Sequence, residues 1–285
     1  MSADVQIFDE RECHLGEGPL WHPERGQLFW FDINAKRLLC RDASGPVMWQ
    51  FDEHVSATGW VDQETLLVAS ETALFRFDIA TGAREHVIAL EADDPVTRSN
   101  DGRADPWGGF WIGTMGKQAE DRAGAIYRFY QGQLEPLYHD ITISNAICFS
   151  PDRKFAYYTD TPTRQIMRQT LDGEGWPTGP ATVFVDLNGE GLNPDGAVVD
   201  AEGYLWNAQW GANRVTRYAP DGRVDRTVHL AASQPSCPAF GGKDLTDLYV
   251  TSATESLSEV GEADGRVLTV PVAVTGQAEH RVILA

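Results

Sequence analysis

Residues 193–206 read NPDGAVVDAEGYLW, and this stretch decides how the rest of the chain is interpreted. The apolar run AVV, a polar turn with Gly203 and a second apolar run form the pattern of a β-hairpin. Asp195 stands two residues before the first run, at the entrance to a strand with a buried pattern. Asn, Pro, Asp and Gly are ordinary turn formers, so one isolated copy of this pattern predicts only a tight turn. The rest of the chain changes that interpretation.

Runs similar to the end of this hairpin recur along the whole chain. They are FWFDI from Phe29, LLVAS from Leu66, FWIGT from Phe110, AYYTD from Ala156, LWNAQ from Leu205 and LYVTS from Leu248. Successive runs begin about 37 to 49 residues apart, which is a period typical of propeller blades. Further strand patterns follow them, such as ALFRFD from Ala73, with hairpin-turn residues behind. We therefore predict an all-β fold, a six-bladed β-propeller with a central metal site.

The two ends of the chain indicate how the ring closes. The segment VQIFDE from Val5 has no unit of its own, and the last unit, which ends in RVILA at Ala285, is one strand short. We expect the N-terminal strand to complete the last blade, because this pairing removes an open sheet edge. There is no linker and no shift in composition, so we expect residues 1–285 to form a single propeller domain.

The metal site is predicted from one position that is polar in every unit. Asn100 and Asp195 both stand eleven residues before the Trp of their hairpin. The aligned residues are Glu17, Ser56, Asn100, Asn145, Asp195 and Ser236 or its neighbour Cys237. Equivalent positions in a propeller form a ring about its axis, so these side chains should meet at one end of the central channel. Carboxylate and amide oxygens suit a hard cation, and two carboxylates repel each other unless a cation lies between them.

Composition excludes several classes of function. The net charge is −19, from 23 basic and 42 acidic residues, which argues against binding nucleic acid or an anionic membrane. No long apolar run and no signal-peptide pattern is present, and the four cysteines have no metal-ligand spacing, so we expect a cytoplasmic protein with free thiols. There is no GxSxG or HExxH motif. These features suit an enzyme for small molecules, which we expect to be a monomer or a weak oligomer.

Five ordered blocks of sequence carry a resemblance to a known family. They are LGEGPLW, RSNDGRADPWGGFWIGTMG, ISNAICFSPDRKFAYYTDT, NPDGAVVDAEGYLW and PAFGGKDLTDLYVTSA, and they span about Leu15 to Ala253. Together they resemble the SMP-30/gluconolactonase/regucalcin-like family. The resemblance implies a propeller with one divalent cation in its channel, Ca²⁺, Zn²⁺, Mn²⁺ or Fe²⁺, and hydrolysis of sugar lactones. It also implies a set of site residues: the metal ligands Glu17, Asn145 and Asp195, and the sugar contacts Arg98 and Asn100.

The expected reaction is metal-dependent hydrolysis of an aldonolactone, such as glucono-, xylono- or arabinonolactone, to the aldonic acid. Asp195 is the expected general base, although its role as a ligand lowers its basicity. Arg98 also suits a carboxylate, so the lactone of a sugar diacid is an alternative substrate. The same residues would also suit a broader esterase or a non-catalytic cation-binding propeller. Some relatives carry an acidic substrate contact after the GTM block, but this chain has Lys117 and Gln118 there, so a relative's substrate is not transferred.

Overall fold

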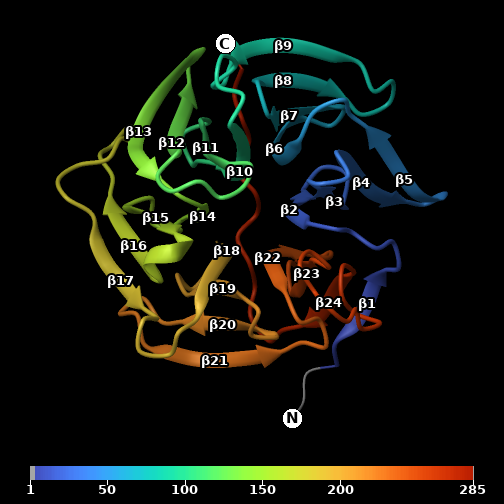
Figure 1. Cartoon of the computed structure of the whole chain (residues 1–285), viewed down its shortest axis with the longest axis vertical. Helices are drawn as coiled ribbons and strands as arrows, with labels where there is room; N and C mark the ends of the chain where they lie inside the picture. Colours follow the sequence, from blue (N-terminus) through green and yellow to red (C-terminus); the bar gives the residue numbers. More distant parts are fainter. Residues whose placement is uncertain (1–3, 285) are drawn as a thin grey trace.

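Six four-stranded sheets stand in a ring, which confirms the predicted six-bladed β-propeller (Figure 1). The computed structural model describes residues 4–284, so residues 1–3 and 285 of the expected domain lie outside the described residues. In each sheet, strands that are adjacent in space pair antiparallel. The only helical element among residues 4–284 is the short 3-10 turn η1 (Thr161–Thr163).

The first three blades each run outward from the channel in chain order. Blade 1 consists of β2 (Gly16–His22), β3 (Gln27–Asp32), β4 (Arg37–Asp42) and β5 (Gly45–Gln50). Blade 2 consists of β6 (Val55–Asp62), β7 (Thr65–Ser70), β8 (Ala73–Asp78) and β9 (Arg84–Ala89). Blade 3 consists of β10 (Thr97–Ala104), β11 (Phe110–Gly116), β12 (Gly124–Tyr130) and β13 (Gln133–Ile141).

Blades 4 and 5 repeat this order, and blade 6 departs from it in its last strand. Blade 4 consists of β14 (Ser144–Phe149), β15 (Phe155–Asp160), β16 (Gln165–Thr170) and β17 (Thr182–Asp186). Blade 5 consists of β18 (Asn193–Val199), β19 (Leu205–Trp210), β20 (Arg214–Tyr218) and β21 (Val224–His229). Blade 6 consists of β22 (Pro235–Gly241), β23 (Asp247–Ser252), β24 (Val267–Pro271) and β1 (Gln6–Asp9).

The aromatic runs that predicted the blades are the second strands. Trp30, Trp111 and Trp206 lie on β3, β11 and β19, and each is completely buried. Their rings pack into the clusters of apolar side chains between neighbouring sheets. Truncating a buried Trp to Ala typically costs about 3–5 kcal/mol, so these residues stabilise the ring as a whole. Because each second strand pairs with the inner strand of its blade, this packing also positions the inner strands around the central channel.

Blade 6 is closed by the start of the chain. β1 pairs antiparallel with β24, with Gln6 opposite Thr269 and Ile7 opposite Leu268. Blade 6 therefore combines three strands from the end of the sequence with one from its beginning. This pairing covers the outer edge of β24, which would otherwise be free to pair with another chain.

Residues 272–284, the C-terminal tail, form no strand and cross the middle of the ring (red trace in Figure 1). The tail leaves blade 6 beside β18, where Asp200 and Gly276 form an isolated bridge. It ends against blades 2 and 3, where Ile283 N donates to the carbonyl of Gly108 at 2.8 Å and the completely buried Val282 joins their apolar core. The sequence pattern RVILA did not predict this crossing.

Two further expectations concern the cysteines and the membrane. All four cysteines are buried free thiols, as predicted. None of the helical structure described for residues 4–284 is long and apolar enough to span a bilayer.

Candidate active site

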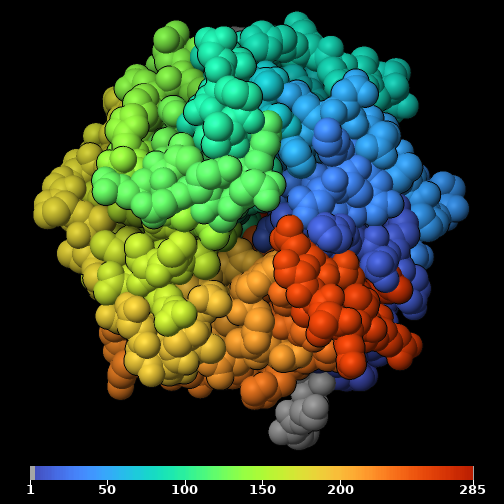
Figure 2. Space-filling model, viewed as in Figure 1, coloured from blue at the N-terminus to red at the C-terminus, as the bar shows by residue number. Residues whose placement is uncertain are grey.

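A pocket of about 1050 Å³ opens at one end of the central channel. Figure 2 shows this face, with a hollow at the centre of the ring between the loop after β11 (green) and the loop after β23 (red). The structure brings all five predicted site residues to the wall of this one pocket: Glu17, Arg98, Asn100, Asn145 and Asp195. They come from the inner strands of four different blades.

A bulge at the same place in every inner strand directs these side chains. The pairing of the inner strand with its neighbour shifts after Glu17 in blade 1, after Asn145 in blade 4, and after Pro194, next to Asp195, in blade 5. Corresponding shifts occur in blades 2, 3 and 6. A β-bulge bends its strand and re-aims a side chain. The polar position found by aligning the units is therefore a position of irregular backbone.

Two members of the aligned ring do not line the pocket, so the prediction that all six converge is wrong for them. The Ser56 hydroxyl donates to Ser99 Oγ at 2.8 Å, and the Ser236 hydroxyl donates to the carbonyl of Gly16. Both serines are completely buried. Their short side chains link neighbouring inner strands instead of reaching the channel.

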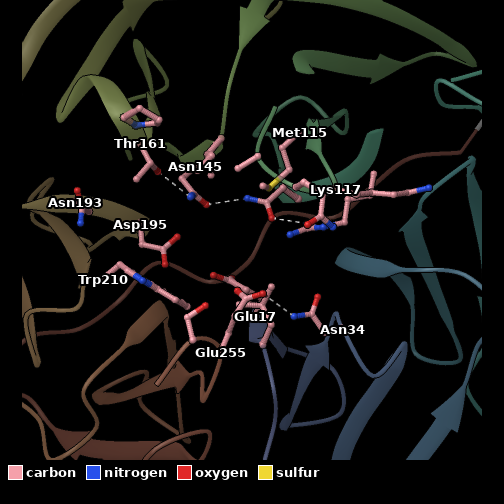
Figure 3. Close-up of a pocket in the computed structure, with 18 of the residues that line it drawn as sticks. Glu17, Asn34, Met115, Lys117, Asn145, Thr161, Asn193, Asp195, Trp210 and Glu255 are labelled. Atoms are coloured by element: carbon pink, nitrogen blue, oxygen red, sulfur yellow. Dashed lines mark hydrogen bonds between the residues drawn. The ribbon is translucent and has the colours of Figure 1, made fainter. Parts of the chain in front are cut away.

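Glu17 and Asp195 concentrate negative charge in the pocket. Figure 3 shows the two carboxylates directed into a common space. Each residue is only 6% exposed, and neither carboxylate forms an ion pair with a basic side chain among residues 4–284. Burial raises the pKa of Glu17 to about 8, and the charge of Asp101 adds to the shift. Burial also raises the pKa of Asp195, with the charge of Glu17 as the second cause.

This set of oxygen atoms fits a divalent cation. In Figure 3 the side-chain amide of Asn145 borders the same space as the two carboxylates, with Glu17 across from it. Carboxylate and amide oxygens are hard ligands, and a cation would compensate the charge that the protein leaves unbalanced. No cluster of three or more His, Cys, Asp or Glu side chains within residues 4–284 is arranged to hold a metal ion. The proposed ligand set is not such a cluster, because it has only two carboxylates, Glu17 and Asp195, and takes its third oxygen from the amide of Asn145.

A chain of hydrogen bonds connects the other predicted residues to this set. Arg98 Nη1 donates to Asn100 Oδ1 at 2.8 Å. Asn100 Nδ2 donates to the Ser144 carbonyl at 2.8 Å and to Asn145 Oδ1 at 3.2 Å. Asn145 Nδ2 donates to Thr161 Oγ1 at 3.0 Å. The chain crosses from blade 3 to blade 4 and fixes the orientation of both amides.

Arg98 is a buried guanidinium without a carboxylate partner. It is 6% exposed, and within residues 4–284 no carboxylate oxygen lies within 4.0 Å of its nitrogens. Burial lowers its pKa to about 10, against the opposing charges of Glu255 and Glu17, so it stays protonated at neutral pH. Its Nη1 is used by Ser99 and Asn100, and the remaining donors have no acceptor among the described residues.

Lys117, which marks the departure from the family pattern, lines the pocket but its charge is paired. Its ammonium donates to the Glu71 carboxylate and to the Pro95 carbonyl at 2.9 Å. The other oxygen of Glu71 lies 2.7 Å from His54 Nδ1. Burial by itself raises the pKa of Glu71, but hydrogen bonds from Lys117 and His54 outweigh it and lower the pKa to about 2.

Several pocket residues were not predicted from the sequence. Trp210 packs on an apolar cluster and also lines the pocket. Glu255, whose Oε1 accepts from Asn34 Nδ2 at 3.0 Å, and Thr161 also belong to the wall. Except for Trp210, which ends the run LWNAQW, these residues lie in connections between strands. Such positions carry no periodic pattern, so the sequence offered no signal for them.

The fold and this oxygen-lined pocket define a six-bladed propeller with a candidate site in its channel, and comparisons with known proteins identify its family. Residues 15–254 match the SMP-30/Gluconolactonase/LRE-like region family. An L-arabinolactonase of Azospirillum brasilense is 38% identical over 92% of this chain and 89% of its own length. A 6-deoxy-6-sulfogluconolactonase of Pseudomonas putida is 36% identical over 98% of both chains.

A solved structure is similar over the whole chain. It is described as a calcium-binding protein, regucalcin, from Agrobacterium tumefaciens, and it superposes with a TM-score of 0.96 at 38% identity, covering 100% of this chain and 99% of that one. The chain belongs to the SMP-30/gluconolactonase/LRE-like family, which confirms the resemblance seen in the sequence.

Proposed function

We propose that this protein uses a divalent cation to hydrolyse a sugar lactone to the free acid. The observation that carries the proposal is the pair of buried carboxylates, Glu17 and Asp195, which have no basic partner among the described residues and face a pocket lined by hydrogen-bonding groups. Relatives with lactonase names match nearly the whole chain, which confirms the expectation of an enzyme of the lactonase class.

Glu17, Asn145 and Asp195 would hold the cation through their side-chain oxygens. When bound, such a cation supplies a Lewis acid that polarises the ester carbonyl of the lactone. The description of the similar structure as a calcium-binding protein supports a divalent cation as the ligand. Ca²⁺, Zn²⁺, Mn²⁺ and Fe²⁺ all accept oxygen ligands and are the candidate metals.

Asp195 is the proposed general base. Its carboxylate accepts a proton from the attacking water and returns it to the ring oxygen that leaves when the ester opens. The same carboxylate serves as a ligand, which lowers its basicity, so the two roles compete. Glu17 has no proton-transfer role in this scheme.

Asn100 and Arg98 hold the sugar in complementary ways. Both hydrogens of Asn100 Nδ2 are donated to the protein, so toward a substrate this side chain offers only its Oδ1 as an acceptor for a sugar hydroxyl. Arg98 keeps donors free for a carbonyl or hydroxyl oxygen. An acceptor and a donor side by side fix the ring for attack by water.

An aldonolactone such as glucono-, xylono- or arabinonolactone is the proposed substrate. Names of the relatives, L-arabinolactonase and 6-deoxy-6-sulfogluconolactonase, support this class. Arg98 has no carboxylate partner among the described residues, which favours a second candidate, the lactone of a sugar diacid, because the guanidinium fork binds carboxylates with two hydrogen bonds.

The test is a panel of pentono-, hexono- and aldarolactones, assayed on chelated protein and after each metal is added back. We expect hydrolysis only with metal. Hydrolysis of neutral lactones alone excludes the diacid substrate, and full activity after chelation excludes the cation. Tight metal binding with no turnover of any lactone or simple ester would support a non-catalytic cation-binding propeller instead.

A further inference from the structure

The far end of the channel is closed by the C-terminal tail. Gln277 Nε2 donates to the carbonyls of Phe149 at 3.0 Å and Val199 at 2.9 Å, which are the last residues of β14 and β18. Farther along, Val282 N donates to the Trp60 carbonyl at 2.9 Å in blade 2. No residue of the described part of the tail lines the pocket. The tail therefore contacts the inner strands from the side opposite the candidate site.

Arg103 connects the tail to three inner strands. It lies on β10, is 8% exposed, and donates from Nε to the Ile147 carbonyl at 3.2 Å and from Nη2 to the Ala197 carbonyl at 3.3 Å. Its Nη1 pairs with the carboxylate of Glu279 in the tail. Glu279 is 9% exposed, and its own carbonyl accepts from Trp60 Nε1 at 2.8 Å. One guanidinium thus binds β14, β18 and the tail at once.

The two carbonyls bound by Arg103 belong to the bulges that direct the proposed metal ligands. Ile147 follows Asn145 by two residues and has no partner in the pairing of β14 with β15. Ala197 follows Asp195 by two residues, where the pairing of β18 with β19 resumes. A bulge leaves backbone groups without ladder partners, so a side chain that binds them limits how far the bulge can move.

We propose that Arg103 and Glu279 are positioning residues: the tail carboxylate holds the Arg103 guanidinium against the bulges of β14 and β18, and this sets the placement of Asn145 relative to Asp195. The inference rests on the proposed function, because it concerns the ligands of that site. Without Glu279 the buried guanidinium has lost its carboxylate partner, which is strongly unfavourable. Residues that do not touch the metal but orient its ligands typically contribute about 10- to 100-fold to metal affinity.

The test compares Mn²⁺ binding to the chelated full-length protein by titration calorimetry. Glu279→Gln removes the charge and keeps the shape. Arg103→Lys keeps a positive charge for Glu279 but lacks the planar fork that reaches two carbonyls. We expect both variants to bind Mn²⁺ about 10- to 100-fold more weakly than the wild type. If Glu279→Gln does not fold, Arg103→Lys carries the test alone.

Asp105→Asn is the matched control, because Asp105 and Arg128 form a fully buried ion pair in the same blade. This pair makes no hydrogen bond to β14 or β18 within the described residues. We expect the control to lower the melting temperature yet keep Mn²⁺ affinity within about twofold. This change is well below the one expected for a residue that orients metal ligands. Equal losses of affinity in the control and in Arg103→Lys, or wild-type affinity in folded Arg103→Lys, would overturn the positioning role. A wild-type protein that binds no divalent cation would instead overturn the proposed site.

Discussion

The two ends of the central channel carry buried charge in opposite ways. At the pocket end, the carboxylates of Glu17 and Asp195 have no basic partner among the described residues. At the far end, Arg103 is paired with Glu279 and its other donors reach backbone carbonyls. Buried charges in proteins are normally paired, so an unpaired set indicates a place where a ligand completes the pairing. The same six inner strands form a closed structural end and an open functional end.

Strand β10 contains this contrast within one element. Arg98 lies at its pocket end and has no carboxylate within 4.0 Å in the described structure, whereas Arg103 near its other end is paired with Glu279. Both arginines are less than a tenth exposed. Two arginines of similar burial on one strand therefore differ in whether a carboxylate pairs with them, and only Arg98 is available to a substrate.

The largest expected effect is the loss of turnover in Asp195→Asn. The substitution keeps the size and one ligand oxygen but removes the proton acceptor, so kcat should fall at least ~100-fold. The measurement is the initial rate of lactone hydrolysis, with metal content determined on the same sample. Ser236→Ala, at an aligned position that does not reach the pocket, should keep kcat. Near-normal kcat in metal-loaded Asp195→Asn would show that another group is the base.

The next effect is on metal binding in Glu17→Gln. Glu17 is one of two uncompensated carboxylates in the proposed ligand set. Its removal should weaken Mn²⁺ binding by more than about 100-fold, which is the upper end of the range for a residue that only orients metal ligands. Glu255→Gln is the control, because it removes a carboxylate that lines the same pocket outside the ligand set. Calorimetry that gives equal affinities for Glu17→Gln and the wild type would remove Glu17 from the site.

A smaller effect concerns the pH dependence of stability that arises from the paired carboxylate of Glu71. The pKa of Glu71 is lowered from 4.5 to about 2, so its stabilising contribution is fully present above pH 4.5 and is lost as the pH falls toward 2. Thermal unfolding of the wild type and Glu71→Gln should therefore differ most at neutral pH and converge toward pH 2. A difference in melting temperature that does not change with pH would contradict the assigned ion pair with Lys117.

The smallest expected effect is a gain in stability in Ala146→Gly. Ala146 has a φ of 58°, a left-handed conformation that costs a residue with a Cβ about 1–2 kcal/mol. Glycine recovers part of this cost, so we expect about 0.5–1 kcal/mol of stabilisation and a rise of about 2 °C in melting temperature.

Gly18, at the equivalent place in blade 1, provides the opposite substitution. Its φ is 54°, and a Cβ there would lie 2.1 Å from the Ser56 carbonyl oxygen. Gly18→Ala should therefore destabilise the protein. A lower melting temperature for Ala146→Gly would show that the backbone at this bulge is not strained.

The fold was predictable because its signal is local and repeated. The aromatic runs recur along the chain, and the runs that begin at Phe29, Phe110 and Leu205 contain the buried Trp30, Trp111 and Trp206 of the second strands. Repetition also allowed the units to be aligned with one another. The alignment found Glu17, Asn100, Asn145 and Asp195, all of which line the pocket.

The same alignment could not tell which ring members reach the pocket. Ser56 and Ser236 occupy the aligned position, but their hydroxyls bind neighbouring inner strands. The direction of a side chain at a bulge depends on local backbone irregularity, which leaves no periodic trace in a sequence.

By itself, the sequence determined the number of blades, the strands within them and the polar residues at the start of each inner strand, because each depends on neighbours close along the chain. Tertiary structure alone decided which charges are paired. Glu279 meets Arg103 across 176 positions of sequence, while Glu17 and Asp195 meet each other and no basic side chain among the described residues. Contacts of this kind exist only once the ring has closed, since closure brings distant segments together on one axis.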